Sequence, residues 1–458
     1  MLLTDAHGAS REKQDGFVKN RGESTFSRKE LSMNTTVEPT KPISEELQAQ
    51  LQAAGVKGIA IDETKLRAHV IRPAYVASAV SDRGIDEERI EAPFRHPGLP
   101  PGPPGPPGPQ LKHLDVKAFG DALHAALKDS TAGYVMRLRE HGTTLYTLEW
   151  NWARYPADGG EGWNPDVQMH VASVSKLLTA MGMTRTLDQH HISYDAKIIE
   201  YLPTYWAKGP NIGDISFRNL MTHTSGLNTA GSATDFATMK EMVAKGVSTD
   251  PHATDFVGHY RYQNMNFGLC RILMSVINGN ISKGATFPAN VQDAFWDFFT
   301  ILGYDAYLQQ YVFTPSEVAH ATLGRTPKTA LAYQFPAAGG WGSGDLASVS
   351  GGAGWHVSVD ELLDIMGTFR RKSVIMPHTN AQNMLDSFFG IDEIADTAAG
   401  RLYNKNGAWG DGSGHEEQTL AYFLPEDMEL AVMANSPVGS PAKFFRGVVD
   451  SIYLANLK

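Results

Sequence analysis

The residues from Met169 to Met181 constrain this chain most, because they place one serine where a short strand meets an amphipathic helix. The run 167–171 is β-like, and the apolar residues that follow recur at the helical spacing i, i+3, i+4 and i+7: Val174, Leu177, Leu178 and Met181. Ser173 lies in the first turn, where unpaired N–H groups and the helix dipole favour a developing negative charge. Lys176 lies one turn later on the same face, so its amine can reach the Ser173 hydroxyl. An amine held beside a hydroxyl is one way to make serine nucleophilic.

The S-x-x-K pattern alone is weak evidence, since about one or two matches are expected by chance in a chain of this length. Two other matches run from Ser10 to Lys13 and from Ser440 to Lys443. The first lies in a polar tail and the second contains a proline, and neither opens an apolar-faced helix. Ser173 is therefore the candidate nucleophile.

Composition excludes several classes of protein. Of the 458 residues, 42% are hydrophobic and 10% aromatic, which is enough for a sizeable core. The net charge of −10 gives no basic surface for nucleic acid, and the single Cys270 excludes an internal disulfide framework. No apolar run is long enough to span a membrane, and residues 1–20 lack the apolar core of a secretory signal. We therefore expect a cytoplasmic protein without a membrane partner.

Local composition divides the chain into four parts. Residues 1–42 are polar, mixed in charge and poor in aromatics, which predicts a disordered tail. Residues 43–96 are an N-terminal extension of unknown fold, although 43–54 has the pattern of a short helix. Residues 97–110 are rich in Pro and Gly, which predicts a stiff polyproline II linker. The main domain is expected at 111–458.

Within the main domain, predicted strands lie at both ends and a helical pattern lies between them. Residues 132–152 predict two strands that turn at His141-Gly142, and 401–436 predict three more. This order predicts an α+β fold in which the first and last segments share one antiparallel sheet. The long polar stretch 228–259 is a candidate lid or pocket wall.

A second motif, Tyr262-Gln263-Asn264, is the only Y-x-N in the chain. A tyrosine between two ammonium groups loses its proton more readily, so Tyr262 can act as general base and then as acid to a leaving group. Asn264 would orient the substrate and Lys176. Standing alone, the motif would fit an ordinary packed tyrosine on a loop.

A third motif, Lys405-Asn406-Gly407, lies on a predicted strand near the C-terminus. Lys405 would supply positive charge for a substrate carboxylate and would keep Tyr262 acidic. Gly407 would let the strand backbone approach the substrate closely, so that the whole motif, Asn406 included, lines the substrate site. Standing alone, a strand lysine before a turn glycine is commonplace.

The backbone beside the first and third motifs completes the predicted site. The N–H groups of Ser173 and Ala408 would form an oxyanion hole for the negative oxygen of a tetrahedral intermediate.

The three motifs in this order resemble the serine β-lactamase and penicillin-binding protein superfamily, especially class C β-lactamases and family VIII carboxylesterases. The resemblance runs from about Leu114 to the C-terminus, and it includes two framework stretches of that superfamily, 215–227 and 351–363. It implies a β-lactamase/transpeptidase-like fold, in which the shared antiparallel sheet packs against an all-helical subdomain. It also implies a covalent acyl-enzyme on Ser173.

The third motif departs from the K-T-G or H-x-G usual in that superfamily, because position 406 is Asn. The turn at 409–415 is also longer than in typical members. These departures leave open whether Gly410 or His415, rather than Lys405, occupies the third site.

Other enzyme classes lack their motifs in this chain. No serine has the G-x-S-x-G context of an α/β-hydrolase. H-E-x-x-H is absent, and the adjacent His190 and His191 cannot both face one metal on a helix. A phosphate-binding G-x-x-x-x-G-K-[ST] loop is absent as well. We expect neither a metal nor a cofactor.

The predicted function is hydrolysis of a small-molecule carboxylic ester or amide through an acyl-enzyme on Ser173, with Lys176 and Tyr262 as the general base. Two alternatives share this machinery: a β-lactamase and a D-Ala-D-Ala carboxypeptidase. Their cell-wall substrates lie outside the cytoplasm, so the lack of an export signal disfavours them. A further alternative is a penicillin-recognising fold used only for binding, and the sequence predicts no oligomeric state.

Overall fold

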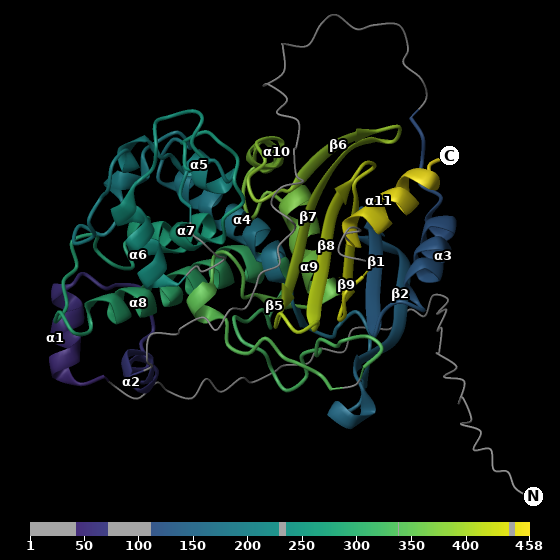
Figure 1. The fold of residues 1–458 in the computed structure, drawn as a ribbon, viewed down its shortest axis with the longest axis horizontal. Coiled ribbons are helices and arrows are strands. Elements are labelled where there is room, and N and C mark those ends of the chain that lie inside the picture. The colour runs from purple at the N-terminus through teal and green to yellow at the C-terminus, as the bar shows by residue number, and fades with distance from the viewer. Residues whose placement is uncertain (1–42, 72–110, 229–234, 338, 439–444) are drawn as a thin grey trace, which may run out of the picture.

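The computed structural model describes residues 43–71, 111–228, 235–337, 339–438 and 445–458 (Figure 1). The predicted tail at 1–42 and the predicted linker at 97–110 lie outside these residues. Part of the predicted lid, 229–234, lies outside them too.

One antiparallel sheet of seven strands, in the order β3-β2-β1-β9-β8-β7-β6, forms one half of the structure (Figure 1). Its strands are β1 (Gly133–Glu140), β2 (Thr143–Arg154), β3 (Glu161–Gly162), β6 (Glu393–Thr397), β7 (Gly400–Gly410), β8 (Glu416–Leu424) and β9 (Met428–Ala434). β1 pairs with β9 from Tyr134 opposite Ala434 to Glu140 opposite Met428. The first and last segments of the main domain therefore share the sheet, which confirms the predicted α+β architecture.

Helices cover both faces of this sheet, and the alternation of side chains along β1 fits this arrangement. Tyr134 and Met136 pack with α3 (Val116–Leu127) and α11 (Phe445–Ala455) on one face. Val135, between them, belongs to the core on the opposite face, where α9 (Val359–Arg371) packs against β1 and β9 (Figure 1). The sheet is therefore the central layer between two layers of helices.

The other half of the structure is helical and contains α4 (Ser175–Gln189), α5 (Phe217–Met221), α6 (Phe236–Lys245), α7 (Asn264–Ile277), α8 (Gln292–Leu308) and α10 (His378–Asp386). α4 is its central helix: every residue from Ser175 to Thr184 is buried, and the helix packs against α7, α8 and α10. A helix that is buried all round belongs to a protein core. Among the residues that the structure describes, no helix is both long and apolar enough to cross a membrane.

Two N-terminal helices, α1 (Glu45–Ala53) and α2 (Glu63–Ile71), lie beside α8 at the far end of this helical half (Figure 1). Leu51 and Leu66 are 3% and 2% exposed and belong to the same apolar core as α7 and α8. His69 Nε2 lies 3.1 Å from a carboxylate oxygen of Asp297 on α8. The described part of the N-terminal extension is therefore docked on the helical half.

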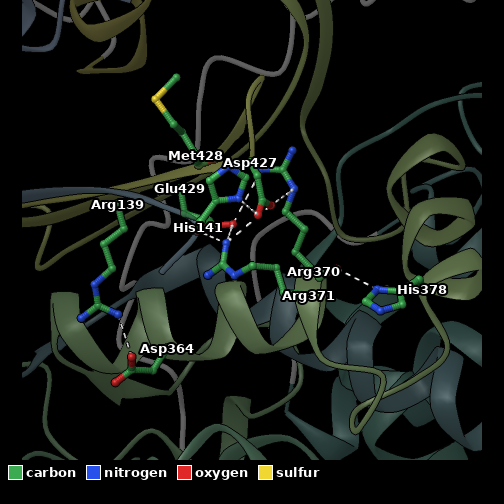
Figure 2. Close-up of polar contacts among 9 residues, drawn as sticks. All are labelled: Arg139, His141, Asp364, Arg370, Arg371, His378, Asp427, Met428 and Glu429. Atoms are coloured by element: carbon green, nitrogen blue, oxygen red, sulfur yellow. Dashed lines mark hydrogen bonds and ion pairs between the residues drawn. The ribbon is translucent and has the colours of Figure 1, made fainter. Parts of the chain in front are cut away.

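A network of ion pairs fixes α9 to the sheet (Figure 2). Arg371 Nη1 donates to both carboxylate oxygens of Glu429, at 2.6 and 2.8 Å, and Glu429 is fully buried on β9. Burial raises the pKa of Glu429, and the neighbouring Arg371 opposes that rise. Arg370 donates to the Met428 carbonyl at 3.0 Å and pairs with Asp427 at 3.1 Å. These contacts hold α9, and α9 follows directly on the 351–357 segment that reaches the candidate site.

Candidate active site

Ser173 lies where a short strand passes into the buried helix α4. The strand β4 (Met169–His170) pairs with β5 (His356–Val357), and a single 3-10 turn, η2 (Ala172–Val174), joins it to α4. Ala172 has a φ of +47°, a conformation that strains a non-glycine residue by about 1–3 kcal/mol and often accompanies a functional site. Ser173 is 6% exposed. The predicted strand-to-helix junction is present, with the serine in the 3-10 turn just before α4.

Lys176 lies within hydrogen-bonding distance of three acceptors. Its Nζ is 2.7 Å from Ser173 Oγ, 2.6 Å from Asn264 Oδ1 and 2.7 Å from the Gly352 carbonyl, and the side chain is fully buried. An ammonium group has three N–H donors, so one donor faces each acceptor. This arrangement suits a charged Lys176 and leaves the proton of the serine hydroxyl free to point elsewhere.

The Tyr262 hydroxyl lies 2.7 Å from Ser173 Oγ and donates to it. Once Tyr262 has lost its proton, the same contact lets its oxygen accept the proton of the Ser173 hydroxyl. Two cations lie near its ring: Lys176 Nζ is 4.8 Å and Lys405 Nζ 5.2 Å from the ring centroid. Nearby positive charges favour the phenolate form of a tyrosine. The structure thus brings the predicted serine, two lysines and tyrosine together.

Lys405 forms an ion pair that the sequence analysis did not anticipate. Its Nζ lies 2.5 Å from Asp392 Oδ1, and the exposed fractions of the two side chains are 1% and 4%. The other oxygen of Asp392 accepts the Asn406 N–H at 3.0 Å. The charge expected for a substrate carboxylate is therefore compensated within the protein, which fits the high cost of burying a lysine without a partner.

The strand β7 runs against the Ser173 segment at Gly407. A Cβ atom there would lie 2.5 Å from the Val171 carbonyl oxygen and 2.8 Å from the Ser173 nitrogen, so only glycine fits. The Asn406 N–H points to the strand edge where Asp392 lies, and alternate residues of a strand direct their N–H groups to the same edge. The Ala408 N–H is therefore directed to that edge as well, as a second oxyanion donor requires.

Comparison with known proteins assigns the family. Residues 121–447, well over half of the chain, match the Beta-lactamase family model. The chain is a member of the beta-lactamase family. It is 22% identical over 180 residues to the putative penicillin-binding protein PbpX of Bacillus subtilis (strain 168), which covers 38% of each chain. This beta-lactamase-family protein therefore matches only about two fifths of that relative's length.

Solved structures share the fold of this beta-lactamase-family protein. The octameric penicillin-binding protein homologue from Pyrococcus abyssi superposes with a TM-score of 0.55 at 14% identity, over 75% of this chain and 77% of that one. The D-amino acid amidase from Ochrobactrum anthropi SV3 gives a TM-score of 0.52 at 16% identity, over 73% and 96%. The expected β-lactamase/transpeptidase-like fold is confirmed.

His223 is a site residue that the sequence analysis named only within a framework stretch. Its ring packs on Tyr262, with centroids 4.3 Å apart, and its Nδ1 accepts the Gln263 N–H at 3.2 Å. Burial, together with the charges of Lys405 and Lys176, lowers the pKa of His223 well below its usual value. A neutral His223 thus supports the Tyr262 segment of this beta-lactamase-family protein.

His415, the alternative third-site residue, lies at the end of the β7–β8 hairpin. Its Nδ1 is 2.6 Å from Asp411 Oδ2 and its Nε2 is 3.1 Å from the Gly339 carbonyl. Gly410, the other alternative, pairs across that hairpin with Glu416. Lys405, by contrast, lies over the Tyr262 ring, with Nζ 5.2 Å from the ring centroid, and this contact favours Lys405 as the third-site residue.

Proposed function

We propose that this protein is a serine hydrolase that cleaves a carboxylic ester or amide through a covalent acyl-enzyme on Ser173. The observation that carries the proposal is the position of Ser173 Oγ, which lies 2.7 Å from both Lys176 Nζ and the Tyr262 hydroxyl. A hydroxyl held between a cation and a potential base has the geometry of an activated nucleophile. Membership of the beta-lactamase family supports the hydrolase assignment.

In the acylation step, the Tyr262 phenolate accepts the proton of the Ser173 hydroxyl as Oγ attacks the substrate carbonyl. Lys176, whose three donors are engaged, remains an ammonium and stabilises both the phenolate and the developing alkoxide. The carbonyl oxygen becomes negative and is bound by the N–H groups of Ser173 and Ala408. Tyr262 then returns the proton to the leaving alcohol or amine as the carbon–heteroatom bond breaks.

In the deacylation step, a water molecule attacks the ester formed with Ser173. Tyr262 removes a proton from that water, the same N–H groups bind the second tetrahedral intermediate, and the proton passes to Ser173 Oγ as it leaves. The products are a carboxylic acid and the free enzyme, so one water is consumed for each bond that is cleaved.

The Lys405–Asp392 ion pair supports an ester or amide substrate over a β-lactam or a D-Ala-D-Ala peptide. Those two alternatives carry a free carboxylate, for which an uncompensated cation would be the natural partner. Here the Lys405 ammonium is already bound to Asp392 at 2.5 Å. A substrate without a carboxylate avoids competing with that pair.

A panel of four substrates tests the proposal: a nitrophenyl ester, a D-amino acid amide, a chromogenic cephalosporin and a D-Ala-D-Ala peptide. We expect the highest kcat/KM for the ester or the amide, and none for any substrate with Ser173→Ala. Higher kcat/KM for the cephalosporin or the peptide would favour those alternatives. Binding of all four without turnover would favour a penicillin-recognising fold used only for binding.

A further inference from the structure

Three buried titratable side chains lie beside the Ser173 segment and take no part in the proposed reaction. His170 is on β4, His356 on β5 and Glu417 on β8, and each is at most 1% exposed. The His170 ring packs against Trp409, the neighbour of Ala408 on β7. The cluster thus lies behind both proposed oxyanion donors.

The first half of the cluster fixes the proton of His170. The Gly354 N–H donates to His170 Nε2 at 3.0 Å, so a neutral His170 must carry its proton on Nδ1. That Nδ1 lies 3.2 Å from Glu417 Oε2. His170 therefore accepts from the Gly354 loop on one side and donates to Glu417 on the other.

The second half of the cluster connects Glu417 to the Gly354 carbonyl through Ser343 and His356. Ser343 Oγ lies 3.4 Å from Glu417 Oε1 and 3.4 Å from His356 Nε2. His356 Nδ1 lies 3.0 Å from the Gly354 carbonyl, so it must carry the proton and Nε2 must accept. The Ser343 hydroxyl has one proton for two acceptors, Glu417 Oε1 and His356 Nε2. Both contacts are satisfied together only if Glu417 is protonated and donates to Ser343 Oγ while Ser343 donates to His356.

The titratable and charged groups that face Glu417 are His170, His356 and Arg325. Their effect on the protonation of Glu417 is smaller than the effect of burial. Burial raises the pKa of Glu417 to about 8 in spite of Arg325 and His356, which favour the carboxylate. Burial also lowers the pKa of His356 to about 4. Near neutral pH Glu417 and His356 are thus both uncharged.

We propose that Glu417 is a positioning residue whose protonated carboxyl closes a ring of hydrogen bonds that begins and ends on Gly354. The ring holds the loop 351–355, and the Gly352 carbonyl of this loop binds Lys176 at 2.7 Å. Ionisation of Glu417 removes the donor to Ser343 and places a negative charge in the cluster. The loop then loosens, and Lys176 loses a fixed acceptor. The effect on activity rests on the proposed function, whereas the effect on stability does not.

The stability test compares the wild type with Glu417→Gln, which is neutral at every pH and, like the protonated acid, offers an acceptor oxygen and an N–H or O–H donor. In the folded protein Glu417 keeps a proton that a glutamate in the unfolded chain loses near pH 4.5. Between about pH 4.5 and pH 8 the folding equilibrium constant of the wild type, divided by that of Glu417→Gln, should therefore fall by up to about tenfold per pH unit. Denaturant unfolding of both proteins at pH 5 and pH 8 measures this ratio. Glu149→Gln, a partly exposed site on β2, is the matched control and should show no such change.

The activity test measures the rate at which a fluorophosphonate probe labels Ser173 as a function of pH. We expect the wild-type rate to fall above about pH 8 and the alkaline limb to move to higher pH in Glu417→Gln.

Two results would overturn the proposal. One is a ratio of wild-type to Glu417→Gln folding equilibrium constants that is the same at pH 5 and pH 8. The other is the absence, from the wild-type infrared spectrum, of a protonated-carboxyl band that disappears in Glu417→Gln. If the stability ratio changes with pH but the labelling rates of the wild type and Glu417→Gln have the same alkaline limb, the link to Lys176 is overturned. Absence of labelling in every variant, with the ratio still changing, would contradict the proposed function and leave the stability result standing.

Discussion

At the scale of single residues, Tyr262 is the general base of the proposed mechanism and Lys176 stays charged. Removing the phenolic oxygen with Tyr262→Phe should lower kcat/KM by about 10²- to 10⁴-fold, the size of a lost general base, because the packed ring stays in place. Steady-state kinetics on the best substrate of the panel measures this. Tyr260→Phe is the control on the same segment, since its ring lies on His223 rather than on Tyr262, and it should be near wild type. Equal effects of the two changes would contradict the assignment.

The buried Lys405–Asp392 pair has a structural and a catalytic effect that can be separated. Lys405→Ala should lower kcat/KM about a hundredfold or more and move the rising limb of the pH–rate profile to higher pH, because a cation that favours the phenolate is lost. It should also destabilise the fold by about 3–5 kcal/mol, since Asp392 is left buried and unpaired. Asp392→Asn combined with Lys405→Met should restore stability and not activity.

Kinetics and denaturant unfolding of the single and double variants measure both effects, with His415→Ala as the control that should change neither by much. Recovery of activity in the double variant would make Lys405 purely structural. A larger loss in His415→Ala than in Lys405→Ala would place the third motif on the hairpin end instead.

At the scale of elements, the close approach of β7 to the 3-10 turn before α4 sets the geometry of the proposed oxyanion hole. Gly407→Ala would push a methyl group against backbone atoms of Val171 and Ser173, which have little freedom to move. We expect kcat/KM to fall about 10²- to 10³-fold, the effect of losing an oxyanion donor. Gly447→Ala on α11 is the matched control, because nothing lies within 4 Å of its added Cβ. Wild-type kinetics in Gly407→Ala would show that the two backbones are not fixed as described.

Local elements are also where the sequence was most informative. The two-residue turn at His141-Gly142 was predicted from its turn residues, and both residues have positive φ. The framework stretch 215–227 is helical only in α5 (Phe217–Met221), because His223 adopts a φ of +57° that ends the helical run. A residue with positive φ can be recognised in a sequence as the end of a helix when it is glycine or asparagine, but a histidine in that conformation gives no such signal.

The contacts that join distant segments could not be predicted in the same way. Asp392, Gly352 and Glu417 reach the site region from three separate parts of the chain, and each acts through a buried polar contact. Hydrophobic periodicity reports which face of an element is buried, but it does not say which partner satisfies a buried charge. The three motifs were found because their residue types carry chemistry of their own.

At the scale of the whole molecule, α1 and α2 extend the helical half beyond the domain expected at 111–458. Leu51 and Leu66 are buried in its core, and His69 shares Asp297 with the fully buried Arg271. We therefore expect deletion of residues 1–110 to lower Tm, because apolar surface is exposed and Asp297 loses a partner. Ser173 should still be labelled below that Tm. Thermal unfolding, with deletion of residues 1–42 as the control, measures the effect, and equal Tm values for the two deletions would contradict the docking.

The proposed reaction passes through a covalent acyl-enzyme on Ser173, and mass spectrometry can detect this intermediate. The protein is incubated with a fluorophosphonate or β-lactam probe, digested, and analysed by mass spectrometry to find the modified peptide. We expect a single adduct on the peptide that contains Ser173; it should be absent in Ser173→Ala and should form more slowly in Tyr262→Phe. An adduct on another serine, or hydrolysis that persists in Ser173→Ala, would contradict this mechanism.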